Sequence, residues 1–113
     1  MANEEECRAA LNRIAERLMQ VDSEKFAEHV VERNISCHVP DLGLAFRTRI
    51  HAGGLDPFTP TEDPKSAQVR LTVDSDDLVA LAEDRISVAK AWATGRLKIE
   101  AGIFDLLRLR KLI

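Results

Sequence analysis

The stretch that decides the fold is VRLTVDSDDLVALAEDRISVAKAWATGRLKIE, residues 69–100. Its first five residues alternate between apolar and polar, which predicts a strand with one buried face. A helix is expected next, because Asp74 or Ser75 can cap a first turn and apolar residues then recur at helical spacing. Ser87 can cap a second, shorter helix, and Gly95 can end it. The last five residues alternate again, so the stretch predicts a strand, two helices and a second strand.

The segment after this stretch predicts an unusually apolar last helix, over 103–113. Asp105, Arg108 and Lys111 lie three apart and form one narrow polar stripe, and Arg110 is the only other charged residue. An ordinary surface helix carries an apolar stripe about 100° wide, so this helix has more apolar surface than one sheet face can cover. The pattern leaves two interpretations open: a core helix flanked on two sides, or a dimer contact.

Three quoted segments carry a resemblance to a known family. Residues 91–99 read AWATGRLKI, with DDLVALA at 76–82 before them and LLRL at 106–109 after them. In this order and spacing they resemble the signature of the sterol carrier protein-2 (SCP2) domain family, and most closely its bacterial branch. Trp92 stands where the family commonly has Phe.

The resemblance implies an α/β fold of about five mostly antiparallel strands, with helices on one face and an apolar tunnel that holds a lipid or acyl chain. Residues 1–113 are expected to form a single domain of this kind. The apolar lining expected from the resemblance is Phe26, Phe46, Ile50, Leu78, Leu81, Trp92, Leu97, Ile99, Phe104 and Leu107. The expected contacts to a lipid head group are Arg108 and Lys111. Trp92 fits a core position equally well.

The first third of the chain predicts two helices. Asn3 can cap a helix over 3–20, in which apolar residues recur at steps of four and three and form one seam. The favoured interpretation is that this seam docks on the sheet, and the alternative is a dimer zipper. Asp22 and Ser23 can cap a second helix over 24–32, which carries Phe26.

Two alternating runs follow and predict a hairpin. Residues 34–39 and 44–50 alternate between apolar and polar, and the connection between them is short. Residues 51–66 contain two adjacent glycines and three of the four prolines, so they are expected to form a loop that could serve as a mobile rim of the tunnel. Only a stub of a strand is expected within it, at 54–58.

Composition narrows the classes of function and location. The net charge of −3 argues against general nucleic-acid binding, which normally requires a basic surface. No signal peptide and no run of 18 apolar residues is evident, so a soluble protein is expected. The ending RKLI, residues 110–113, is not a peroxisomal address. Together with the bacterial resemblance, these features predict a cytoplasmic protein.

Catalytic and metal sites are not expected. Cys37 and His38 are adjacent on a strand, so their side chains point to opposite faces and cannot form a nucleophile and base pair. Cys7 and Cys37 are expected to be reduced and buried. His29, His38 and His51 show no metal-ligand spacing. The sequence therefore predicts no enzyme activity, no metal and no cofactor.

Two functions of different classes remain. The first is a carrier of a lipid or acyl chain, such as a sterol, fatty acid or fatty acyl-CoA. The second is a structural or regulatory interaction domain with a closed tunnel, which forms a homodimer or docks on an enzyme through its last helix. From residue 90 to 113 there are six Lys and Arg against two carboxylates, a local charge of +4. An anionic membrane surface is therefore a further expected partner, although simple solvation of these charges is the commoner explanation.

Overall fold

The structure is a computed structural model that describes residues 2–19, 32–51 and 54–112. Side chains are not described for residues 17–19 and 108–112 of the helices that end the first and last of these ranges. The helix predicted over 24–32, with Phe26, lies outside the described residues except for Glu32, which is not helical.

The described parts of the chain contain helices at both ends and most strands in between. The helices are α1 (Glu4–Met19), α3 (Ser75–Ala82), α4 (Val88–Ala93) and α5 (Ile103–Leu112), with short 3-10 turns at Pro40–Leu42 and Pro64–Ser66. The strands are β1 (Arg33–Val39), β2 (Leu44–His51), β3 (Gly54–Leu55), β4 (Thr59–Pro60), β5 (Val69–Val73) and β6 (Leu97–Glu100).

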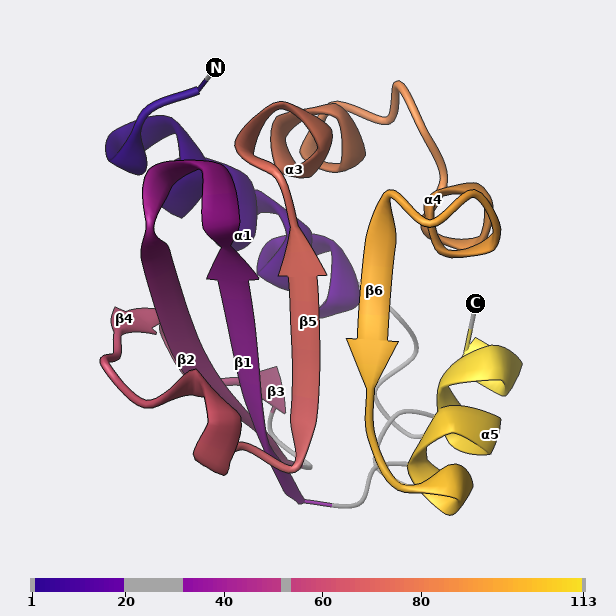
Figure 1. The fold of residues 1–113 in the computed structure, drawn as a ribbon. Helices are drawn as coiled ribbons and strands as arrows, with labels where there is room; N and C mark the ends of the chain where they lie inside the picture. The colour runs from indigo at the N-terminus through magenta and orange to yellow at the C-terminus, as the bar shows by residue number, and fades with distance from the viewer. Residues whose placement is uncertain (1, 20–31, 52–53, 113) are drawn as a thin grey trace.

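These strands form one sheet in the order β3-β2-β1-β5-β6, and β4 pairs separately with β2 (Figure 1). β1 and β5 run parallel, and the other pairs are antiparallel. The mixed α/β architecture and its mostly antiparallel sheet confirm the predicted fold class. The hairpin is confirmed by the register, in which Cys37 lies opposite Phe46. The strand stub predicted within 54–58 is confirmed as β3, but the loop also contains β4, which the sequence did not predict.

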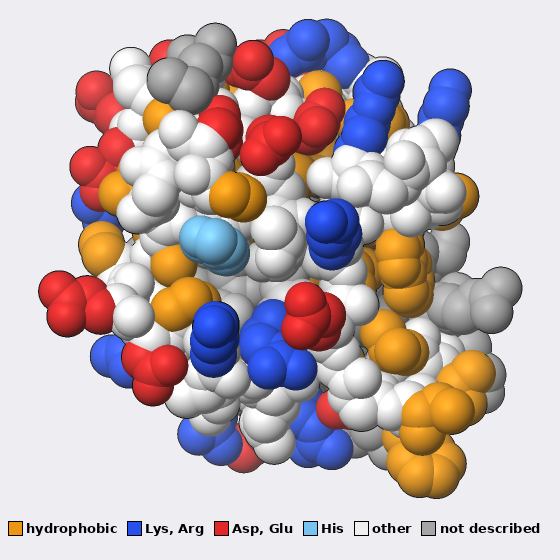
Figure 2. All heavy atoms as spheres, in the orientation of Figure 1, with side chains coloured by type: hydrophobic (Ala, Val, Ile, Leu, Met, Phe, Trp, Pro, Cys, Tyr) orange, Lys and Arg blue, Asp and Glu red, His pale blue; other side chains and the backbone are white. Residues whose placement is uncertain are grey.

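The two faces of the sheet differ in chemistry because side chains alternate along each strand. Cys37, Val39 and Phe46 point to one face and are buried. Arg47 and Lys98 point to the other face and are exposed. Figure 2 shows this second face, where basic side chains gather over the strands. The sheet therefore has one core face and one charged, open face.

The core face packs against α1, α3 and α4, and α1 lies behind the sheet in Figure 1. Within α1, Cys7 and Leu11 are buried and Ile14 packs against the same cluster, which confirms that the described part of this apolar seam belongs to the core. The buried apolar cluster consists of Ala2, Cys7, Ala10, Leu11, Cys37, Val39, Phe46, Val73, Leu78, Leu81, Ala82, Ala91 and Leu97.

The start of α3 is capped by a residue that is distant in sequence. Asp74 occupies the N-cap position but makes no side-chain capping hydrogen bond, and Ser75 does not cap the first turn. Instead, the Asp41 carboxylate accepts hydrogen bonds from the Ser75 amide, at 2.9 Å, and from the Ser75 hydroxyl. The Ser75 hydroxyl in turn accepts a bond of 3.1 Å from the Ala2 amide. The prediction of a local cap by Asp74 or Ser75 was therefore wrong, because the turn after β1 supplies the carboxylate.

Two other predicted caps are confirmed, and the predicted cap at Asp22 and Ser23 lies outside the described residues. The Ser87 hydroxyl accepts a hydrogen bond from the Lys90 amide at 3.1 Å. The Asn3 side chain accepts one from the Glu6 amide at 2.8 Å, and the Glu6 carboxylate accepts one from the Asn3 amide at 3.3 Å. This reciprocal pair is a capping box, which satisfies two amides that would otherwise lack partners.

Two phenylalanines test the assignment of the core. Phe46 is 0% exposed, whereas Phe104 on α5 is 74% exposed. We expect Phe46→Ala to lower the free energy of unfolding by about 3–5 kcal/mol, because it removes buried contacts and leaves a cavity. Phe104→Ala should change it by no more than about 0.5 kcal/mol. Urea denaturation of both variants measures the difference, and similar losses in the two would contradict this core.

The cap of α3 predicts a dependence of stability on pH. The hydrogen bond from the Ser75 hydroxyl holds the pKa of the Asp41 carboxyl below its ordinary value. Because the folded pKa is the lower one, the stabilisation is present above about pH 4 and is lost as the pH falls through the folded pKa.

Asp41→Asn should therefore lower the melting temperature at neutral pH, and its difference from the wild type should shrink in acid. Thermal unfolding across the pH range measures this, with Asp74→Asn as the matched control. If Asp74→Asn produced the larger loss, the capping role would belong to Asp74 instead.

Candidate functional site

The predicted lining residues fall into three groups by exposure. Phe46, Leu78, Leu81 and Leu97 are buried and belong to one apolar cluster. Ile50, Trp92 and Ile99 are half-buried. The third group, Phe104 and Leu107, is exposed.

The buried group is assembled from three elements. Phe46 comes from β2, Leu97 from β6, and Leu78 and Leu81 from one face of α3. Ile99 lies two positions after Leu97, so it shares the core face of β6 and packs at the margin of the cluster. The structure thus brings five of the predicted residues to the same apolar layer.

The other two half-buried positions, Trp92 and Ile50, are not among the residues that pack against this cluster. Trp92 projects from α4, which packs against β6, and Ile50 lies near the end of β2. The sheet pairs Ile99 with Leu71 of β5, which is also half-buried and packs against the cluster. On its β6 side, the buried core is therefore bordered by apolar side chains that are only partly buried.

Three large apolar side chains in the first five residues of the last helix, α5, are exposed. Ile103, Phe104 and Leu107 are 70%, 74% and 51% exposed. Asp105 instead points toward the sheet, where its carboxylate accepts a hydrogen bond of 3.2 Å from Arg33 Nε at the start of β1. Phe104 and Leu107 therefore do not join the buried group, and their role as lining residues stays a prediction. The side chains of Arg108 and Lys111 lie outside the described set, so the predicted head-group contacts also stay a prediction.

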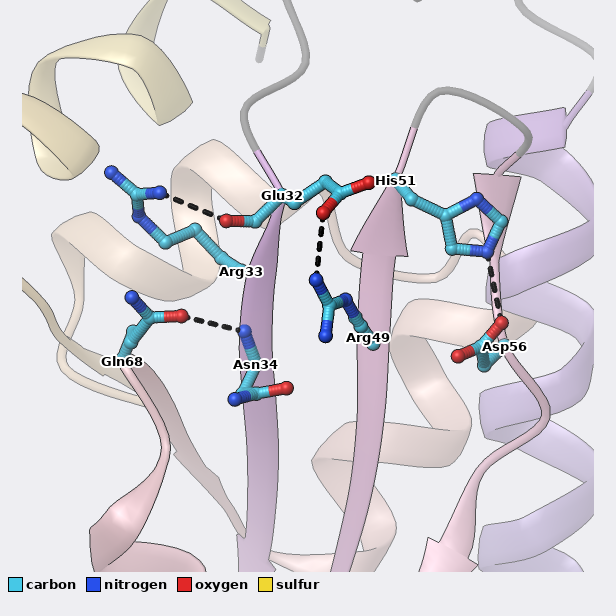
Figure 3. Close-up of polar contacts among 7 residues, drawn as sticks. All are labelled: Glu32, Arg33, Asn34, Arg49, His51, Asp56 and Gln68. Carbon is cyan, nitrogen blue, oxygen red and sulfur yellow. Dashed lines mark hydrogen bonds and ion pairs between the residues drawn. The ribbon is translucent and has the colours of Figure 1, made fainter.

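Polar contacts hold the end of the sheet from which β1 starts (Figure 3). The Glu32 carboxylate pairs with Arg49 Nη2 at 2.6 Å, and the Glu32 carbonyl accepts a bond from Arg33 at 2.8 Å. His51 Nε2 lies 2.9 Å from the Asp56 carboxylate. Exposed pairs such as Glu32–Arg49 contribute little stability. The Glu32 carboxylate nevertheless offsets the positive charge of Arg49 at this end of the sheet.

The contact between Arg33 and Asp105 was missed by the sequence analysis. The two residues are 72 positions apart, and no local spacing links them. The only available signal was the single acidic residue within an otherwise basic and apolar helix. That signal shows that Asp105 is unusual, but it does not identify its partner.

The two thiols lie within the core. Cys7 is on α1 and Cys37 on β1, both without a disulfide. Burial raises the pKa of the Cys37 thiol to about 12, with a smaller contribution from Cys7, and burial also raises the pKa of Cys7. A thiol with a raised pKa carries almost no thiolate at neutral pH, and the thiolate is the nucleophile. These cysteines therefore suit packing and not covalent catalysis.

The described ranges contain neither a metal-binding cluster nor a membrane-spanning helix. No group of three or more His, Cys, Asp and Glu side chains there is arranged to hold a metal ion. None of the helices described there has both the length and the apolar character needed to cross a membrane.

Comparison with protein families gives one match that covers almost the whole chain. The model of the SCP-2 sterol transfer family matches residues 3–113. Comparison with curated proteins gives no match.

Several solved structures have a similar fold. A crystal structure of sterol carrier protein 2 like 2 from Aedes aegypti has a TM-score of 0.62 at 15% identity, over 96% of this chain and 97% of that one. A solution structure of sterol carrier protein 2 from Aedes aegypti in complex with palmitate has a TM-score of 0.59 at 16% identity, over 99% and 96%. At these identities the likeness concerns the fold alone.

A larger protein also contains a similar unit. A sec-alkylsulfatase from Pseudomonas sp. matches 82% of this chain with a TM-score of 0.58 at 19% identity. This chain covers only 14% of the sulfatase. The match therefore concerns a small part of that enzyme. It gives no information about the reaction that the sulfatase catalyses.

The burial of the two thiols is directly testable. In the folded protein at about pH 8, we expect Cys37 to react with iodoacetamide at least about a thousandfold more slowly than a free cysteine, because burial and a raised pKa both suppress the thiolate. Both cysteines should react fully in guanidinium chloride. Mass spectrometry of time points gives the rates, and rapid labelling of Cys37 in the folded state would reopen the case for a reactive thiol.

Proposed function

Since the chain belongs to the SCP-2 sterol transfer family, we propose that it binds a lipid or acyl chain between its helices and its sheet and carries it. Palmitate is bound by the sterol carrier protein 2 of Aedes aegypti, which has a similar fold. A chain of this type is the ligand class proposed here. The proposal includes a single domain over 1–113, a cytoplasmic location and a role without catalysis.

The observation that carries this proposal is the incomplete burial of apolar side chains beside the core. Ile99 and Leu71 pack against the buried cluster on its β6 side and remain half-buried. Apolar surface gains free energy when it leaves water, at roughly 25 cal/mol per Å². An acyl chain placed along these side chains would complete their burial while its own methylenes leave water.

The energetics suit a carrier that must also release its ligand. Each buried methylene contributes about 0.8 kcal/mol, so a C16 chain gains on the order of 12 kcal/mol at most. Association costs on the order of 4–15 kcal/mol, which leaves weak to micromolar binding. One methylene changes discrimination by only about 1–3 kcal/mol. Such a site selects a class of chain and not one molecule.

The second candidate is an interaction domain with a closed tunnel. It is favoured by the complete burial of Phe46, Leu78, Leu81 and Leu97 within one packed cluster. If these side chains stay packed, no chain can enter among them. Under this alternative, the protein would act by forming a homodimer or by docking on an enzyme.

Native mass spectrometry of protein purified without detergent separates the two candidates. The carrier function predicts a co-purifying lipid on the protein, which organic extraction then identifies. It also predicts that adding palmitate to delipidated protein raises its melting temperature. Protein that carries no lipid and shows unchanged stability with a series of fatty acids and acyl-CoAs would support the interaction domain instead.

Two neighbouring residues on β6 provide a matched pair of variants. Ile99 lies on the core face, whereas Lys98 lies on the open face and is exposed. We expect Ile99→Trp to fill the space that a chain would use and to weaken palmitate binding by about tenfold or more. Lys98→Trp adds the same side chain to the opposite face and should leave affinity unchanged. Fluorescence titration measures both, and equal affinities would remove Ile99 from the site.

A further inference from the structure

The outward face of α5 is the largest exposed apolar feature among the described residues. Ile103, Phe104 and Leu107 occupy positions i, i+1 and i+4 of one helix, so they lie on one side of it. They are the exposed large hydrophobic residues within the described parts of the chain. With ~200 Å² for a fully exposed large side chain, their exposed fractions amount to on the order of 400 Å². Figure 2 shows this apolar projection at the lower right, beyond the edge of the sheet.

A partly buried polar contact fixes this orientation. The Asp105 side chain is 15% exposed and bonds to Arg33, whose side chain is 29% exposed. Rotating α5 to bury its apolar side would pull Asp105 away from Arg33 and leave charges without their partner. Breaking a partly buried pair of this kind is costly. The pair therefore holds the apolar side chains toward the surroundings.

The size of the patch argues against a second copy as its partner. A stable protein interface buries about 800 Å² on each side, roughly twice the area that these three side chains offer. The charge of the helix also argues against a second copy. Three of the five residues after Leu107 are cationic: Arg108, Arg110 and Lys111. A symmetric dimer through α5 would bring these like charges together.

A short helix that combines an exposed apolar side with a cationic sequence is typical of segments that lie in a membrane interface. Anionic head groups attract such cations by about 1 kcal/mol each, while apolar side chains enter the acyl boundary. The exposed part of α1 has the opposite character, with four glutamates against Arg8 and Arg13 over residues 4–16. Charge complementarity therefore favours α5 over α1 as the side that meets an anionic bilayer.

We propose that α5 docks the protein on an anionic membrane surface by inserting Ile103, Phe104 and Leu107 among the lipid chains. This proposal rests on the proposed carrier function, because a carrier must take its lipid from a bilayer and release it to a bilayer. α5 follows β6 directly in the chain, and the half-buried Ile99 lies on that strand. Docking by α5 would thus place the β6 side of the ligand layer near the bilayer.

Vesicle sedimentation tests this proposal with the full chain. We expect the wild type to bind vesicles of equal parts phosphatidylcholine and phosphatidylglycerol, and to bind phosphatidylcholine vesicles much more weakly. Ile103→Gln should lower the partition coefficient by about tenfold or more, because the apolar contribution is lost. Arg110→Gln should lower it by about fivefold, on the anionic vesicles only. High salt should weaken the anionic binding.

Matched controls on α1 keep the test specific. Ala9 and Arg8 are both exposed there, so Ala9→Gln and Arg8→Gln should leave vesicle binding unchanged. Circular dichroism checks that every variant folds. The proposal is overturned if the wild type ignores anionic vesicles, if Ile103→Gln binds as well as the wild type, or if Arg8→Gln loses as much as Arg110→Gln. A wild-type dimer that Ile103→Gln converts to monomer would overturn it in favour of self-association.

A separate measurement distinguishes this inference from the carrier function. Palmitate binding is titrated in solution without vesicles, for the wild type and for Ile103→Gln, and both should bind equally. Vesicle binding without palmitate binding would refute the carrier function and leave the docking surface intact. Palmitate binding without vesicle binding would refute the docking surface alone.

Discussion

The burial of one face of the sheet is the constraint on which the rest of the structure depends. Phe46, Cys37 and Val39 lie at its centre and are inaccessible to water, and α1 and α3 supply the apolar side chains that cover them. Because the side chains of a strand alternate, burying these residues forces their neighbours to the opposite face. That face carries Arg47 and Lys98 and stays open to solvent.

Because only one face of the sheet is buried, the long-range side-chain hydrogen bonds described below lie at the ends of helices and strands. Asp41, in the turn after β1, caps α3 through Ser75, and the same hydroxyl receives the Ala2 amide. Three distant segments therefore meet at one buried serine. The opposite end of the sheet carries the contact between Arg33 and Asp105, which ties α5 to β1. Both contacts position helices that a hydrophobic layer alone would leave free to rotate.

The proposed ligand layer and the proposed docking surface use apolar residues in different ways. Ile99 and Leu71 are half-buried beside the core, where a chain can complete their burial. Ile103 and Phe104 are mostly exposed and have no core to join. A carrier needs both kinds of surface, because it must shield a chain from water and also approach the bilayer that supplies it. The fold places them on consecutive elements, β6 and α5.

The sequence by itself determined the elements and their faces. Alternation in residues 34–39 and 69–73, a local cap such as Ser87 and a stop such as Gly95 depend on neighbours in the chain, so local periodicity suffices to predict them. The buried positions of Phe46 and Leu97 follow from the same alternation. Only the tertiary structure decided which residue caps α3 and which way α5 faces. Those outcomes depend on Asp41 and Arg33, which lie 34 and 72 positions from their partners, and local periodicity carries no information about contacts at such separations.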